Sequence, residues 1–126
     1  MKKASERGAV PAPAADRAGQ SPDARVVVVT APAELARLET VRLLDRLEEI
    51  GIGTSAVVMN ALTAPGCRRC DRAVRVEARV IQALARACST TRRGRCPMVL
   101  APSVAPPPRG VAALGRWGHT WTRATP

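Results

Sequence analysis

The sequence is poor in aromatic residues, lysine and histidine. It contains no Tyr or Phe and only two Trp, and its single histidine is His119. Lys2 and Lys3 are the only lysines, and no Gly-Lys-Ser or Gly-Lys-Thr sequence occurs. A P-loop needs that lysine and hydroxyl residue after a glycine-rich turn to hold nucleotide phosphates. This polypeptide therefore lacks the phosphate-binding sequence of an ATPase, and one histidine without a matched nucleophile indicates no catalytic triad.

Long apolar runs are also missing. No segment approaches the roughly 20 apolar residues that span a bilayer, and no apolar core follows the N-terminal lysines as it does in a signal peptide. We therefore expect a cytoplasmic protein without a membrane span. Residues 1–24 contain three Pro and almost no large aliphatic side chains, which predicts a disordered Pro/Ala-rich tail. One small domain over residues 25–122 and a short tail over 123–126 follow.

The charge of the chain is strongly positive. The formal net charge is +10, and 18 of the 20 basic residues are arginine. Clustered cations favour a nucleic-acid partner because they neutralise phosphates and release counterions. However, a chain this rich in Arg, Ala, Gly and Pro is also typical of a compositional bias, and proteins that bind single strands interleave aromatic residues with their cations. Nucleic-acid binding is therefore the least favoured of the functions considered.

The first half of the domain has the pattern of a strand, a helix and a second strand. The run Val26–Val29 is β-branched without polar alternation, which predicts a strand buried on both faces of a parallel sheet. Apolar residues at helical spacing follow from Pro32 to a stop at Gly51, and the apolar run 56–60 predicts a second strand. This βαβ unit places Asn60 at the carboxyl end of a parallel strand, where ligands of open α/β sheets bind.

The second half adds a helix, a strand and a closing helix. Asp71 is the predicted N-cap of a helix over residues 72–88. A polar connection over 89–95 leads to a strand over 96–101, a Pro-rich loop over 102–110 and a short helix over 111–121. The predicted fold class is α/β, with a partial, mostly parallel sheet and flanking helices in three layers.

Four short motifs in this order resemble one protein family. They are Leu38-Glu39-Thr40 with Arg42-Leu43, Val57-Val58-Met59-Asn60, Cys67-x-x-Cys70, and Leu100-Ala101-Pro102 leading to Arg109-Gly110-Val111. Together they resemble the C-terminal part of the arsenical pump-driving (ArsA-type) and tail-anchored-protein-targeting (GET-type) ATPases of the P-loop NTPase superfamily. The resemblance covers about Arg25 to Trp121 and implies the C-terminal half of a P-loop NTPase-like domain.

The resemblance implies a binding site for the base of ATP. The asparagine at the place of Asn60 contacts the adenine in the family, whereas an Asn in that position without such a role ends the strand and favours a turn. The family's loop around the base corresponds to Pro102 through Arg109, so Asn60, Pro102 and Arg109 are the candidate nucleotide-binding residues. The acidic residue that many relatives carry in this loop is absent here, and residues 106–108 are prolines without backbone donors. We therefore expect ATP to bind weakly, or only with a partner that carries the P-loop half.

The resemblance also implies a metal site at Cys67 and Cys70. In GET-type members this CxxC meets its twin across a two-fold axis and holds one zinc ion. Structural zinc takes four tetrahedral ligands, of which one CxxC supplies two and a symmetric dimer the other two. The alternatives are redox chemistry, an intrachain metal site that uses Cys88 and Cys96, or no function. For Cys88 and Cys96 themselves we expect ordinary buried small side chains.

Three function classes follow. The first is a fragment or split half of an ArsA/GET-type ATPase that contributes the adenine side of the site and does not hydrolyse ATP alone, because phosphoryl transfer needs positioned phosphate donors and metal. The second is a non-enzymatic assembly module built on the CxxC, and the third is a basic nucleic-acid-binding protein. The expected partners are a second copy through the CxxC segment or a protein carrying the P-loop half, since a three-stranded parallel sheet leaves an open edge.

Overall fold

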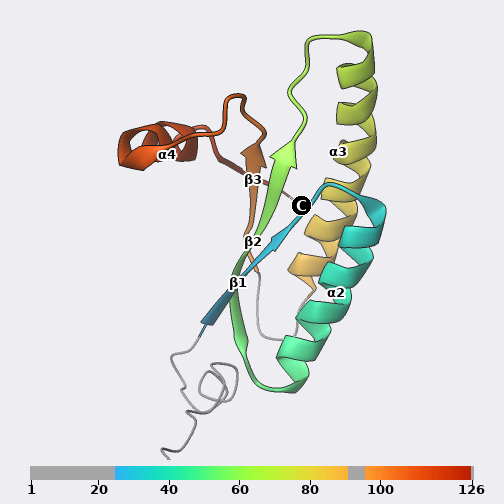
Figure 1. Cartoon of the computed structure of the whole chain (residues 1–126). Coiled ribbons are helices and arrows are strands. Elements are labelled where there is room, and N and C mark those ends of the chain that lie inside the picture. The colour runs from blue at the N-terminus through green and yellow to red at the C-terminus, as the bar shows by residue number, and fades with distance from the viewer. Residues whose placement is uncertain (1–24, 91–95, 126) are drawn as a thin grey trace, which may run out of the picture.

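The computed structural model describes residues 25–90 and 96–125 (Figure 1). The predicted disordered tail and most of the predicted polar connection 89–95 lie outside the described residues. The elements in chain order are β1 (Arg25–Thr30), α2 (Glu34–Glu49), β2 (Gly53–Leu62), α3 (Arg68–Ser89), β3 (Met98–Pro102), α4 (Gly110–Gly118) and β4 (Thr122–Arg123).

The strands form one mostly parallel sheet in the order β1-β2-β3-β4. β1, β2 and β3 are parallel, and Val57 lies opposite both Val28 and Met98. β4 runs antiparallel to β3, with Thr122 opposite Leu100. The predicted α/β class with a mostly parallel sheet is therefore confirmed. The sequence did not predict β4, because two residues are too few to show a strand pattern.

The two long helices cover the same face of the sheet (Figure 1). β2 lies beside β1 and β3 lies beside β2, always in the same direction across the sheet. Two crossover connections of the same handedness therefore place their helices on one face of the sheet. The short α4 lies on the other side, beyond the end of β3 (Figure 1), an arrangement compatible with a three-layer fold. The core lies between the sheet and α2 and α3, and it is formed by Val28, Leu44, Leu47, Ile52, Val57, Met59, Val80, Leu84, Ala85, Cys88, Cys96 and Met98.

The prediction that β1 is buried on both faces is wrong for the described residues. Val28 points into the core and is 5% exposed, whereas Val27 and Val29 are 55% and 63% exposed. Because α2 and α3 lie together on the Val28 side, the opposite side of β1 has no covering layer among the described elements. We call Val27 and Val29 the open face of β1. β1 is the terminal strand of the sheet, and among the described residues it pairs only with β2.

α3 is longer than predicted and has a different N-cap. It begins at Arg68, and Cys67 rather than Asp71 is the capping residue. The backbone of Cys67 is extended, and its sulfur accepts the backbone N–H of Cys70 at 3.1 Å. The Asp71 carboxylate instead accepts the N–H of Gly66 at 3.3 Å. Neither α3 nor any other helix in the described residues is long and apolar enough to cross a membrane.

Candidate functional site

Asn60 and Pro102 lie at the same edge of the sheet, near the carboxyl ends of two neighbouring parallel strands. Leu62 pairs with Pro102, and an irregularity in the register separates this pair from Met59 and its partner in β3. The side-chain oxygen of Asn60 accepts the N–H of Ala61 at 2.8 Å. Ala61 has a φ of 60°, in the left-handed region that residues other than glycine seldom adopt. The amide oxygen of Asn60 therefore stabilises the irregular backbone between Met59 and Leu62. Asn60 does not end the strand, because β2 continues to Leu62.

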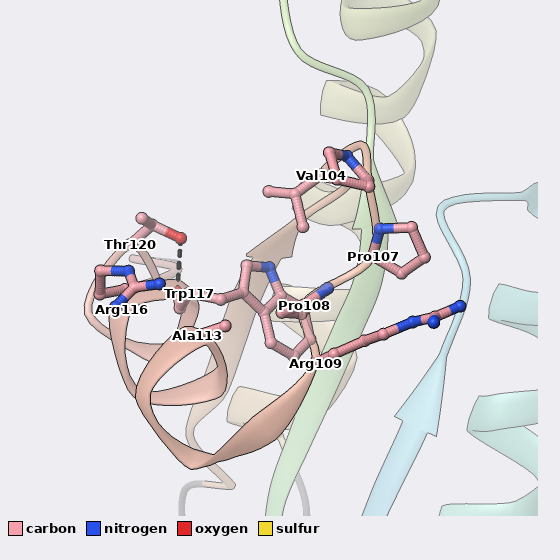
Figure 2. Close-up of a pocket in the computed structure, with 9 residues that line it drawn as sticks. Val104, Pro107, Pro108, Arg109, Ala113, Arg116, Trp117 and Thr120 are labelled. Atoms are coloured by element: carbon pink, nitrogen blue, oxygen red, sulfur yellow. Dashed lines mark hydrogen bonds between the residues drawn. The ribbon is translucent and has the colours of Figure 1, made fainter.

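An open groove of about 660 Å³ lies between the Pro-rich loop and α4 (Figure 2). Its lining residues come from this loop, from α4 and from the residues directly after α4: Val104, Pro106, Pro107, Pro108, Arg109, Ala113, Arg116, Trp117 and Thr120. The indole N–H of Trp117 donates to the carbonyl of Pro102 at 2.8 Å, which fixes α4 to the end of β3. The rings of Trp117 and Trp121 meet edge to face at 4.9 Å. The groove thus has an apolar wall with a fixed aromatic ring at the carboxyl edge of the sheet.

The polar groups of the groove are two guanidinium groups and one hydroxyl. Arg109 is the N-cap residue of α4, and Figure 2 shows its side chain extending away from Thr120 and Arg116. The Thr120 hydroxyl donates to the carbonyl of Trp117 at 2.6 Å. A mostly apolar concave surface with a few polar groups is the usual composition of a small-molecule site. Such a groove suits a flat ring compound. The guanidinium groups of Arg109 and Arg116 are available to bind an anionic substituent on it.

Of the three predicted nucleotide-binding residues, only Arg109 is among the residues that line this groove. Pro102 is not a lining residue, but its carbonyl accepts the indole N–H of Trp117, which is one. Asn60 lies on the neighbouring strand and is not among the lining residues. Trp117 and Arg116 were not predicted as site residues, because the sequence shows them only as part of a short closing helix. The available signal was that Trp117 is one of only two aromatic residues in the chain.

Cys67 and Cys70 form a dithiol at the first turn of α3, in which Cys67 is exposed and Cys70 is partly exposed. The Cys70 thiol donates to the Cys67 sulfur, and this bond, with the N–H groups of Cys70 and Arg69, holds the pKa of Cys67 below its usual value. The same bond raises the pKa of Cys70. Cys67 is therefore the residue that ionises first, while Cys70 keeps the shared proton. Thiolates are the form that attacks electrophiles and binds metals.

The described residues supply at most two metal ligands at this position. They contain no group of three or more His, Cys, Asp or Glu side chains that could hold a metal ion. Structural zinc takes four ligands, so a zinc site at Cys67 and Cys70 would need a second copy of the chain. Cys88 and Cys96 cannot complete it, because the other end of α3 lies about 30 Å away at 1.5 Å per residue. The alternative of an intrachain site built from both pairs is therefore wrong.

Cys88 and Cys96 are buried in the core, as the sequence predicted, and they lie next to each other. Their exposed fractions are 1% and 8%, and the N–H of Cys96 donates to the carbonyl of Cys88 at 3.2 Å. Burial, with a smaller effect of the neighbouring Cys96, raises the pKa of Cys88 to about 11. Burial also raises the pKa of Cys96. This pair stays protonated and packs as small apolar side chains.

No protein family model matches this sequence, and no curated protein matches it significantly. The resemblance to the ArsA/GET-type ATPases therefore rests on the four short sequence motifs alone.

Proposed function

We propose that this domain is the base-side half of an ArsA/GET-type nucleotide site, completed by a P-loop-bearing segment outside this sequence. The observation that carries the proposal is the groove at the carboxyl end of β3, with Trp117 held against Pro102. Ligands of open α/β sheets bind outside the carboxyl ends of the strands. ATP would place its base against Trp117 and the prolines, and its phosphates would face the segment that supplies the P-loop.

The uncovered surfaces of the sheet support such a partner segment. Parallel sheets are normally covered on both faces, whereas Val27 and Val29 are exposed on one of them. β1 is also the terminal strand of the order. A segment that adds strands beside β1 and a helix over its open face would complete both the sheet and the nucleotide site.

Binding of adenosine tests the base-side groove. In ¹⁵N NMR of the full chain, the indole N–H of Trp117 reports on the groove, and Trp121 provides an internal comparison. We expect adenosine to shift the Trp117 signal saturably. Ala113→Arg, which fills the groove, should abolish this shift, while Ala112→Arg on the exposed side of the same helix should not, since Ala112 is not a lining residue.

Two results would contradict the groove. One is the absence of a saturable adenosine shift, and the other is an equal shift in the Ala113→Arg variant. Inorganic tripolyphosphate serves as the control for charge, because the chain is strongly basic. If tripolyphosphate reproduced the whole effect of ATP on Trp117, the nucleotide would be bound through its phosphates on a basic surface.

We further propose that the purified chain does not hydrolyse ATP, because the described site has no phosphate-positioning elements. Turnover that co-elutes with the chain and falls in Asn60→Ala would contradict this. Turnover that is indifferent to that substitution would identify a contaminating ATPase.

A second candidate function is assembly through the dithiol. The observation that favours it is that Cys67 and Cys70 are adjacent and accessible, and that the pKa of Cys67 is lowered. We propose that two copies hold one zinc ion between their CxxC segments in a reducing cytoplasm. Zinc analysis with light scattering should give one metal per two chains, and Cys67→Ser should lose both metal and dimer. The control Cys96→Ala should keep both, and a monomer that lacks zinc at equimolar metal would contradict the proposal.

A further inference from the structure

One side of α3 carries a line of arginines. They recur at intervals of four, three, four and seven residues, which at 3.6 residues per turn places all of them on the same face. Each is exposed, and the core residues Val80, Leu84 and Cys88 lie on the opposite face. We call this set the arginine stripe, and its members are Arg68, Arg72, Arg75, Arg79 and Arg86.

The charges of the stripe are not neutralised within the described residues. Each arginine of α2 has a carboxylate three residues away, in the pairs Arg37–Glu34, Arg42–Glu39 and Arg46–Glu49. No arginine of the stripe forms an ion pair with another described residue. The two acidic residues of α3 are engaged elsewhere, because Asp71 accepts from Gly66 and Glu77 from Thr63.

This difference between the helices argues against composition alone as the origin of the stripe. A bias towards arginine would enrich both helices, but α2 balances its three arginines with five acidic residues. α3 combines six arginines with two acidic residues. Uncompensated like charges in one row repel each other, and an anionic partner removes this cost. The surface is therefore complementary to a row of negative charges.

The length of the stripe matches a nucleic-acid backbone. Arg68 and Arg86 are 18 residues apart, or about 27 Å along the helix axis. One DNA strand presents roughly eight phosphates over that length, at 3.4 Å each. The planar guanidinium fork also suits phosphate oxygens, which it can bind through two parallel hydrogen bonds.

We propose that the arginine stripe of α3 binds the phosphate backbone of duplex DNA without reading its sequence. A single strand fits less well, because its bases need aromatic stacking partners and α3 has none. A membrane surface also fits less well, because interfacial helices border their cations with large apolar side chains. On α3 the only large hydrophobic residue that is clearly exposed is Val76. The proposal shares no residue with the nucleotide groove.

Paired substitutions on the two helices test the proposal in the full chain. Fluorescence anisotropy with a labelled 20-base-pair duplex would be measured over about 50–200 mM salt, the range in which phosphate contacts change affinity strongly. Arg75→Gln/Arg79→Gln should weaken binding at least about tenfold and reduce the slope of log K against log salt by about 2. Arg42→Gln/Arg46→Gln removes the same charge from α2 and should change affinity less than about threefold.

Three results would overturn the proposal. Equal losses in the two variants would assign binding to net charge, and tighter binding of a single strand of the same length would reject the duplex. Binding to vesicles with phosphatidylserine that exceeds duplex binding and depends on Arg75 and Arg79 would assign the stripe to a membrane. Arg68→Gln/Arg72→Gln provides an independent second variant if the first melts at a lower temperature than the parent chain.

Discussion

Both carboxylate oxygens of Glu77 accept hydrogen bonds from Thr63. One comes from the backbone N–H at 2.9 Å and the other from the hydroxyl at 2.6 Å. Thr63 directly follows β2 and Glu77 lies in α3. This contact therefore holds the end of the strand against the helix, on either side of the connection that carries Cys67. It also explains why an acidic residue interrupts the apolar side of α3 that carries Val80 and Leu84.

Glu77→Ala is expected to destabilise the domain by about 2–3 kcal/mol, because hydrogen bonds to a charged acceptor contribute about 1.5–3 kcal/mol and the Thr63 donors lose their partner. Urea unfolding followed by circular dichroism measures this change. Glu39→Ala removes an exposed ion pair on α2 and should cost less than about 1 kcal/mol. Equal costs for the two variants would show that the Thr63 contact does not hold α3.

Native alkylation should distinguish the four cysteines. Because the pKa of Cys67 is lowered and that of Cys70 is raised, iodoacetamide should modify Cys67 first at neutral pH. The rate at Cys67 should level off at a lower pH than the rate at Cys70. Mass spectrometry of peptides from a pH series checks this order. Cys88 and Cys96 should react only after denaturation, and labelling of either as fast as Cys67 would contradict the buried positions.

The stability of the domain should fall at alkaline pH because of Cys88. Its pKa rises from an ordinary value of 9.0 to about 11 on folding, so the unfolded chain releases this proton first. The contribution of Cys88 to the free energy of unfolding is therefore fully present below pH 9. It is lost as the pH rises from 9 to about 11, and the total loss is at most about 3 kcal/mol. Urea unfolding at several pH values under reducing conditions measures this loss. The decline should be smaller in Cys88→Ala, and identical slopes would rule out this residue as the cause.

Lysine substitutions on β1 should separate the two faces of that strand. Val29→Lys lies on the open face, so we expect a melting temperature close to that of the parent chain and less self-association in light scattering. Val28→Lys buries a charge without a partner and should prevent folding. Unfolding of Val29→Lys to the same degree would show that the open face is covered in solution.

The local elements could be predicted because their signals lie within a few residues. The run Val26–Val29 predicted β1, and the apolar spacing between Pro32 and Gly51 predicted α2, which the structure places at Glu34–Glu49. The edge that carries Asn60 and Pro102 was likewise predicted, since a βαβ unit brings the carboxyl ends of its strands together. The groove beside α4 could be predicted only in part, because Trp117 is held in it through a contact with Pro102, fifteen residues away.

The sequence by itself determined the order of strands and helices along the chain as far as α4, and the absence of a P-loop within these residues. Tertiary structure alone decided that Val27 and Val29 are exposed, that Cys88 lies beside Cys96, and that Glu77 of α3 is bound to Thr63 and not to an arginine. The physical reason is that periodicity marks which side of an element is apolar or charged. Only the packing of segments distant in sequence determines what covers that side.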